Sequence, residues 1–209
     1  MHVPHSVLTE LDSRLELLSK LQPKSALANA DLLWATEFYE VKHSAISILA
    51  GLSSTQQNPV IERIRNWITH DLDQRLMIEI LDAFKNQPDI LLNDQWIDSL
   101  SQWLSGSDDD IRRIGLKAIQ ETIRMNYKNL PKIFKLLNPV FQNPRISYQK
   151  ELVDVIRVLI ERSEAETASF MIMTATLYPN KDVRAFVRKC LPMFDPFFQV
   201  EIRSHLTQP

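Results

Sequence analysis

The chain has 209 residues, of which 44% are hydrophobic and 24% are charged, values that are ordinary for a globular protein. Its net charge of −2 excludes binding to nucleic acid through overall basicity, so a nucleic-acid binder of this composition needs a local positive patch. Three glycines and one cysteine argue against hairpin-rich β architecture, glycine-rich nucleotide-binding loops, internal disulfides and cysteine-rich metal sites.

Helical periodicity, interrupted by short turns that often contain proline, predicts a chain that is helical from end to end. The predicted helices cover residues 5–21, 25–37, 39–52, 58–69, 72–86, 89–104, 109–126, 130–142, 146–162, 165–178, 181–193 and 196–206. Proline fits the first turn of a helix and disfavours helical geometry at the residue before it, so Pro59, Pro144 and Pro196 mark helix boundaries.

Five of these helices share one sequence register. They are aligned on Val41, Asp73, Ile111, Tyr148 and Val183, with spacings of 32 to 38 residues. Counted from each of these starts, the residues at plus four and plus eight are small or apolar. The residue at plus one is long and polar. This period and apolar stripe predict an all-α protein, a right-handed α-solenoid of about five HEAT-like helical pairs. We expect a single repeat domain over residues 1–209, with an N-terminal capping helix at 1–22 and stacked pairs at 25–207.

The second helix of each predicted pair carries many of the basic residues. They are Lys42, His43, Arg75, Arg112, Arg113, Lys150, Arg184 and Arg188. In stacked helical pairs the second helices commonly line the concave wall, so Arg75, Arg113 and Lys150 are expected to form one cationic strip. The alternative is a set of salt-bridged helix faces. The carboxylates close enough to neutralise the strip are Glu79, Asp109, Asp110, Glu151 and Asp154.

Two segments resemble the HEAT-like DNA alkylation-repair glycosylases, the AlkD-type family. In residues 31–49, Trp34 precedes an acidic, aromatic, acidic turn, and a helix with Lys42 near its start follows. In residues 103–119, a tryptophan and a short acidic turn precede an apolar helix, and Arg113 falls at the arginine position of the family. The resemblance extends over residues 25 to 195.

A third segment, residues 66–73, resembles the Asn/Ser-Trp-x-x-x-Asp patch in which such enzymes carry a catalytic aspartate. Trp67 and Asp71 have the spacing of this patch, and Asp73 is the alternative in a register shifted by two residues. By this resemblance Asp71 or Asp73 stabilises oxocarbenium-like charge on the sugar, and Trp67 attracts the charged base. Arg113 and Lys150 then contact phosphates.

The resemblance implies a DNA-binding protein, and a DNA glycosylase that excises cationic N3- or N7-alkylated purines from double-stranded DNA without a cofactor. In this family the damaged base is thought to stay near the stack, so a shallow groove suffices. The alternative is a non-catalytic HEAT-like scaffold that binds a protein partner on its inner wall. The family's late tryptophan is absent here, where Met193 and Phe194 occupy its neighbourhood.

Structural roles remain open for the candidate residues. Asp71 and Asp73 also suit helix capping, and Trp67 lies on an apolar face that predicts a core position equally well. His70 with the two aspartates lacks a fourth ligand, so no metal site is expected. Cys190 lies on an apolar stripe, which favours a packed thiol. We expect no membrane span and no signal peptide, and therefore a cytoplasmic protein.

Overall fold

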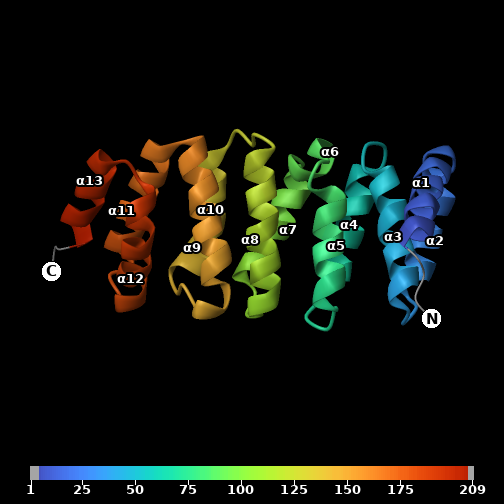
Figure 1. Ribbon diagram of the computed structural model, residues 1–209, viewed down its shortest axis with the longest axis horizontal. Coiled ribbons are helices and arrows are strands. Elements are labelled where there is room, and N and C mark those ends of the chain that lie inside the picture. The colour runs from blue at the N-terminus through green and yellow to red at the C-terminus, as the bar shows by residue number, and fades with distance from the viewer. Residues whose placement is uncertain (1–4, 207–209) are drawn as a thin grey trace. The chain divides into compact units, whose positions relative to one another are not determined.

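The computed structural model describes residues 5–206, with side chains from residue 10 onward, and its regular structure there is entirely helical (Figure 1). The helices are α1 (His5–Leu21), α2 (Pro23–Trp34), α3 (Tyr39–Leu52), α4 (Gln57–Trp67), α5 (Gln74–Phe84), α6 (Pro88–Leu91), α7 (Asp94–Ser105), α8 (Asp109–Arg124), α9 (Leu130–Phe141), α10 (Gln149–Arg162), α11 (Glu164–Leu177), α12 (Lys181–Cys190) and α13 (Pro196–Leu206), with 3₁₀ turns η1 (Ile146–Tyr148) and η2 (Leu191–Met193). The predicted all-α class is confirmed. Residues 1–4 and 207–209, which the expected domain limits include, lie outside the described residues.

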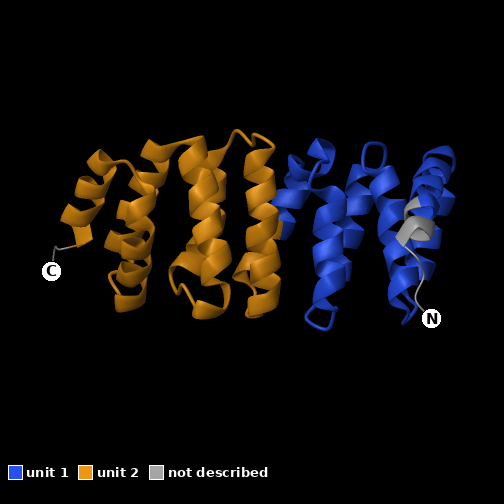
Figure 2. Ribbon diagram, in the orientation of Figure 1, with its two compact units in different colours: residues 1–99 blue, residues 100–209 orange. Residues whose placement is uncertain are grey.

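The chain divides into two compact units, residues 1–99 and 100–209 (Figure 2). In the first unit α1 and α2 pack against α3, and α3 packs against α5. In the second unit α8 packs against α10, α9 packs against α11, and α11 packs against α10, α12 and α13. Each unit is thus a stack of helical pairs, the solenoid architecture that the repeat predicts. The single repeat domain over residues 1–209 stays a prediction.

The repeat register corresponds to the buried stripe of the second helices, α3, α5, α8, α10 and α12. The residues four positions after each start are all buried: Ala45, Met77, Gly115, Leu152 and Val187. The residues eight positions after each start are also buried: Leu49, Leu81, Ile119, Ile156 and Leu191. A side chain at Gly115 would meet Leu104 at 3.1 Å and Trp103 at 3.3 Å, so the glycine lets α8 approach α7 closely.

The predicted helix 89–104 is wrong, because the chain breaks between α6 and α7. Leu92 leaves helical geometry at φ −98° and ψ 1°, and α7 begins at Asp94. The Asn93 side chain accepts a hydrogen bond from the backbone N–H of Gln95 at 2.9 Å. Asparagine competes well for such amides at helix starts, and it therefore favours a new helix over continuation of the old one.

The core contains two tryptophans of α7 and the cysteine, whose predicted packed position is confirmed. Trp96 and Trp103 are both buried. The Cys190 thiol is also buried, and burial raises its pKa to about 12, so it remains an unreactive core group.

Among the helices of the described residues, none has the length and apolarity needed to cross a bilayer.

Candidate functional site

A cleft of about 520 Å³ opens in the first unit, where the ends of α2 and α4 meet the starts of α3 and α5. The structure brings two of the three family-like segments together here. Trp34 and Lys42 of the first segment line the cleft, as do Trp67, Asp71 and Asp73 of the third. These residues supply aromatic surface, carboxylates and a cation within one concave site.

The aromatic wall of the cleft is a pair of stacked indoles. The ring centroids of Trp34 and Trp67 lie 4.1 Å apart, and the ring planes differ by 5°. Trp67 is only 7% exposed, which confirms its predicted core position, whereas Trp34 is half-buried at the cleft. The Nζ atom of Lys42 lies 5.1 Å from the centroid of Trp34, so this ring already holds a cation.

The stack follows from the repeat. Trp34 is the last residue of α2, and Trp67 is the last residue of α4, so each closes the first helix of its pair. They are 33 residues apart, which is close to the local repeat spacing. Sequence reasoning missed this contact, although the equivalent positions of the two tryptophans in successive pairs were a usable signal.

Asp73 has a structural role at the start of α5. Its carboxylate accepts a hydrogen bond from the backbone N–H of Arg75 at 2.8 Å, and it pairs with the Arg75 guanidinium at 2.9 Å. The side-chain and backbone hydrogen bonds from Arg75 lower the pKa of Asp73. The predicted capping role is therefore confirmed for this residue.

Asp71 is much freer than Asp73. Its side chain is 82% exposed, and its carboxylate lies 2.9 Å from Nε2 of the exposed His70. Neither Lys nor Arg lies within 4.0 Å of this carboxylate among the described residues. Both candidate aspartates line the cleft, and Asp71 is the one that does not cap α5.

Tyr39 and Arg75 form the side of the cleft next to α5. The Arg75 guanidinium lies 4.9 Å from the ring centroid of Tyr39. The Tyr39 hydroxyl donates a hydrogen bond to Glu79. Burial, the bond to Glu79 and the charge of that carboxylate raise the pKa of Tyr39 to about 12, so the hydroxyl stays protonated at neutral pH.

His43 belongs to a polar network that joins α1, α3 and α5. Its Nδ1 lies 3.3 Å from Glu79, and its Nε2 lies 3.0 Å from Asp12. Asp12 also accepts a hydrogen bond from the Ser47 hydroxyl at 2.6 Å. Burial acts to lower the pKa of His43, but its hydrogen bonds with Asp12 and Glu79 and their charges outweigh burial and raise it. The imidazole is thus held between two carboxylates of the protein.

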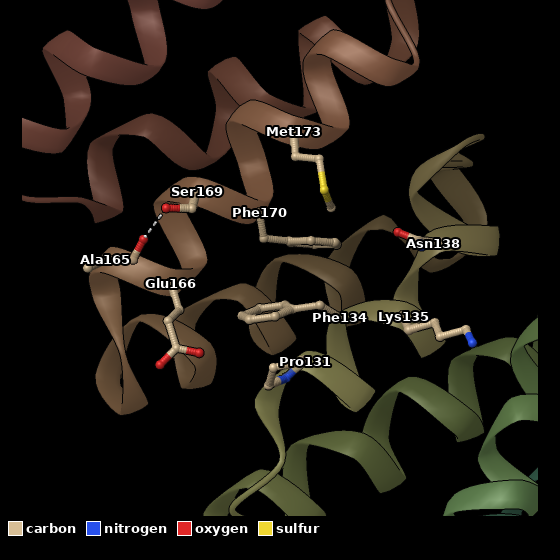
Figure 3. Close-up of a pocket in the computed structure, with 9 residues that line it drawn as sticks. All are labelled: Pro131, Phe134, Lys135, Asn138, Ala165, Glu166, Ser169, Phe170 and Met173. Carbon is tan, nitrogen blue, oxygen red and sulfur yellow. Dashed lines mark hydrogen bonds between the residues drawn. The ribbon is translucent and has the colours of Figure 1, made fainter.

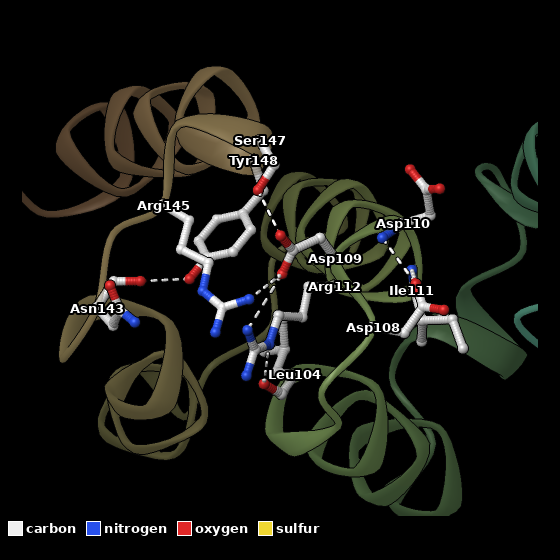
Figure 4. A network of polar contacts seen from close by, with 10 residues as sticks. All are labelled: Leu104, Asp108, Asp109, Asp110, Ile111, Arg112, Asn143, Arg145, Ser147 and Tyr148. Carbon is white, nitrogen blue, oxygen red and sulfur yellow. Dashed lines mark hydrogen bonds and ion pairs between the residues drawn. The ribbon is translucent and has the colours of Figure 1, made fainter.

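In the second unit, Arg112 is part of a structural network centred on Asp109 (Figure 4). The Asp109 carboxylate pairs with Arg112 at 3.3 Å and Arg145 at 3.2 Å, and it accepts a hydrogen bond from Ser147 at 2.6 Å. The bond from Ser147 is the largest cause of the lowered pKa of Asp109. Arg112 is only 13% exposed and donates to the Leu104 carbonyl, so it ties α8 to α7 and to the turn before α10.

Arg113 is also neutralised by carboxylates. It pairs with Asp110 at 3.3 Å and with Glu151 at 3.3 Å, and Glu151 is buried. The salt-bridged alternative is therefore confirmed for His43, Arg75, Arg112 and Arg113. Asp154, the remaining expected neutraliser, pairs instead with Arg157.

Three of the predicted cations keep their charge uncompensated. Lys42, Lys150 and Arg188 have no carboxylate within 4.0 Å among residues 10–206. Lys150 and Arg188 are exposed on α10 and α12, while Arg184 is half-buried on α12. A cationic strip that includes Arg75, Arg113 and Lys150 stays a prediction.

In the described part of the chain, no group of three His, Cys, Asp or Glu side chains could hold a metal ion.

Comparisons with known proteins give one family and one solved structure. A family model described as "DNA alkylation repair enzyme" matches residues 13–185. No curated protein matches the chain. A designed armadillo repeat protein, YIII(Dq)4CqI, is similar to it at 16% identity with a TM-score of 0.39, covering 91% of this chain and 92% of that one.

Proposed function

The chain belongs to the DNA alkylation repair enzyme family, and we propose that it binds alkylated double-stranded DNA at the cleft of the first unit and releases cationic purines there. Its function is thus related to DNA alkylation repair. Alkylation at N3 or N7 of a purine places a positive charge on the base and makes it a good leaving group. Catalysis then needs a site for a flat cation and a carboxylate near the sugar, rather than a strong general acid.

The observation that carries this proposal is the Lys42 ammonium over the Trp34 ring, which is itself stacked on Trp67. A cation over an indole face is stabilised by about 0.5–2 kcal/mol. An alkylated purine has the same charge and a flat ring that can stack on Trp34. When the base takes this place, the displaced Lys42 ammonium is free to contact a phosphate beside the damaged nucleotide.

Asp71 is the carboxylate that we assign to the sugar. It lines the same cleft as Trp34 and has neither a Lys nor an Arg partner among the described residues. As the bond to the base breaks, its negative charge stabilises the positive charge that develops on the sugar, and its second oxygen orients the attacking water. Asp73 contributes indirectly, because it caps α5 and holds Arg75 at the cleft.

Phosphate binding is assigned to the three uncompensated cations, Lys42, Lys150 and Arg188. Lysine and arginine side chains on phosphates supply affinity without base specificity. The paired residues His43, Arg112 and Arg113 already satisfy carboxylates of the protein, so breaking these pairs would cost part of any gain from phosphate binding. The low net charge is therefore compatible with DNA binding through a few local contacts.

The experiment is a product assay on methylated duplex DNA. Mass spectrometry measures free 7-methylguanine and 3-methyladenine after incubation with the wild type, Asp71→Asn or Asp98→Asn. Asp98 is an exposed carboxylate on α7 outside the cleft and serves as the matched control. We expect release by the wild type and by Asp98→Asn, and none by Asp71→Asn. If the folded wild type releases neither base, the chain is not a glycosylase for these lesions.

A further inference from the structure

A second concave site lies in the second unit, between the first helices α9 and α11 (Figure 3). Its volume is about 480 Å³. The rings of Phe134 and Phe170 are stacked in it with centroids 4.7 Å apart, and Met173 is 44% exposed beside them. We call this site the α9–α11 groove.

The wall that α11 contributes is apolar over most of its length. Residues 167–180 contain no charged side chain. The hydroxyl of Ser169 donates to the Ala165 carbonyl at 2.9 Å, so its proton is used within the helix (Figure 3). Apolar side chains of α11 lie on its buried face, as do Phe170 and Met171, and also on its exposed face, as do Met173 and Leu177. Exposed apolar side chains beside a concave site are typical of an interaction surface.

Charged side chains stand at opposite sides of the α9–α11 groove. Lys135 on α9 and Glu166 on α11 flank the two phenylalanine rings (Figure 3). Lys135 has no carboxylate within 4.0 Å among the described residues. An apolar centre with a charged rim is the usual composition of a protein-binding site. The opposite charges also give the groove two distinguishable sides.

We propose that the α9–α11 groove binds an amphipathic helix of a protein partner. From Pro131 to Asn138 the wall of α9 is about 10 Å long, which matches two turns of a bound helix. Apolar side chains of the partner at positions i and i+4 pack on Phe134 and Met173. An acidic residue of the partner faces Lys135, and a basic residue faces Glu166.

This site is separate from the DNA site proposed above. The α9–α11 groove is built by first helices, whereas Lys150 and Arg188 belong to the second helices α10 and α12. The inference therefore does not rest on the glycosylase proposal. Substitutions in the groove should leave the affinity for methylated duplex DNA unchanged, and this measurement distinguishes a failure of one proposal from a failure of the other.

The probe is a synthetic helical peptide of about four turns. It has leucines at i, i+4 and i+7, glutamates on one flank of this row and lysines on the other. A scrambled peptide of the same composition is the control. Full-length protein with ¹³C-methyl methionine reports on binding through the Met173 methyl signal, and the signal of Met77, buried in the first unit, is the internal reference. We expect the helical peptide to shift the Met173 methyl signal in a saturable way. The scrambled peptide should not shift this signal.

Variants test whether the peptide occupies the groove. Fluorescence anisotropy of the labelled peptide measures the affinity of the variants, since Met173→Glu lacks the Met173 methyl signal. Met173→Glu should weaken binding at least about ten-fold, because it places an unpaired charge against the leucines. Thr176→Glu introduces the same charge on exposed α11 surface outside the groove and should change affinity less than about two-fold. Lys135→Glu should weaken binding about three-fold, and a peptide with lysines in place of the glutamates should restore it.

Four results would overturn the proposal. The first is an unchanged Met173 signal at about 1 mM peptide, and the second is equal binding of the scrambled peptide. The third is self-association of the wild type that Met173→Glu abolishes, since the groove would then be covered by a second copy of the chain. Circular dichroism of the peptide in the complex must also show helix, because an extended bound peptide contradicts the proposed occupant.

Discussion

The indole rings of Trp34 and Trp67 lie 4.1 Å apart and within 5° of parallel, although they close the first helices of two different pairs. The repeat therefore builds the aromatic wall of the cleft by placing equivalent residues of successive pairs in contact. The two rings have different surroundings, since Trp67 is buried and Trp34 is only half-buried. We infer that Trp67 supports Trp34 and that Trp34 presents the stack to a ligand.

Replacing each tryptophan by alanine should separate these roles. Trp67→Ala should lower the free energy of unfolding by about 3–5 kcal/mol, because it removes a buried indole. Trp34→Ala should lower it by about 1 kcal/mol, mainly through loss of the stack, but should weaken binding of methylated duplex about ten-fold. Urea denaturation and fluorescence anisotropy measure the two quantities. The assignment would be contradicted if both variants lost the same free energy of unfolding and Trp34→Ala bound methylated duplex as tightly as the wild type.

Salt dependence should report the number of phosphate contacts. If Lys42, Lys150 and Arg188 each neutralise one phosphate, the slope of log affinity against log salt should be about −3. Changing any one of them to glutamine should make the slope less negative by about one. Arg112→Gln is the control, because Arg112 is mostly buried in the Asp109 network. A slope near zero in the wild type would exclude the proposed phosphate contacts.

The network around His43 should make stability depend on pH. The pKa of His43 is raised in the folded protein, so the folded state binds the imidazole proton more tightly than the unfolded chain does. The resulting stabilisation is complete below the ordinary pKa of 6.5 and is lost as the pH rises through the folded pKa. The quantity to compare is the free energy of unfolding of the wild type minus that of His43→Gln. We expect this difference to fall as the pH rises from below 6.5 through the folded pKa of His43.

Denaturation at several pH values measures this difference. A difference between the wild type and His43→Gln that does not change with pH would show that His43 is not held protonated by Asp12 and Glu79.

Arg113 should matter for stability through its pair with the buried Glu151. Arg113→Gln leaves the buried Glu151 carboxylate without its guanidinium, and we expect a loss of about 1–3 kcal/mol. Changing Glu151 to glutamine in the same protein should recover part of the loss, since the buried charge is then gone. A double-mutant cycle by urea denaturation measures the coupling. A coupling near zero would mean that the pair contributes nothing to stability.

The solenoid was predictable because its signal is repeated. Each second helix places small or apolar residues four and eight positions after its start, and all ten are buried. A break such as that at Asn93 has no repeated signal, since one side-chain cap decides whether the apolar run from 89 to 104 continues. The predicted helix 25–37 ends earlier, at Trp34, because the chain turns there toward α3.

The candidate site was predictable in its residues but not in their pairing. The motifs selected Trp67, Asp71 and Asp73, which line one cleft. Sequence spacing could not decide which aspartate caps α5, because both precede that helix within three residues. It also could not decide which cations are neutralised. Arg113 meets Glu151 from the next pair, a contact that depends on how two helices pack rather than on local spacing.

The most direct measurement is the single-turnover rate of 7-methylguanine release at saturating protein, for the wild type, Asp71→Asn and Asp73→Asn. We expect Asp71→Asn to lower the rate at least about 100-fold without loss of stability, because it removes charge that acts in the transition state. Asp73→Asn should lower stability but keep a rate within about ten-fold of the wild type in the folded protein. Equal rates for the wild type and Asp71→Asn would contradict the assignment of this cleft as the catalytic site.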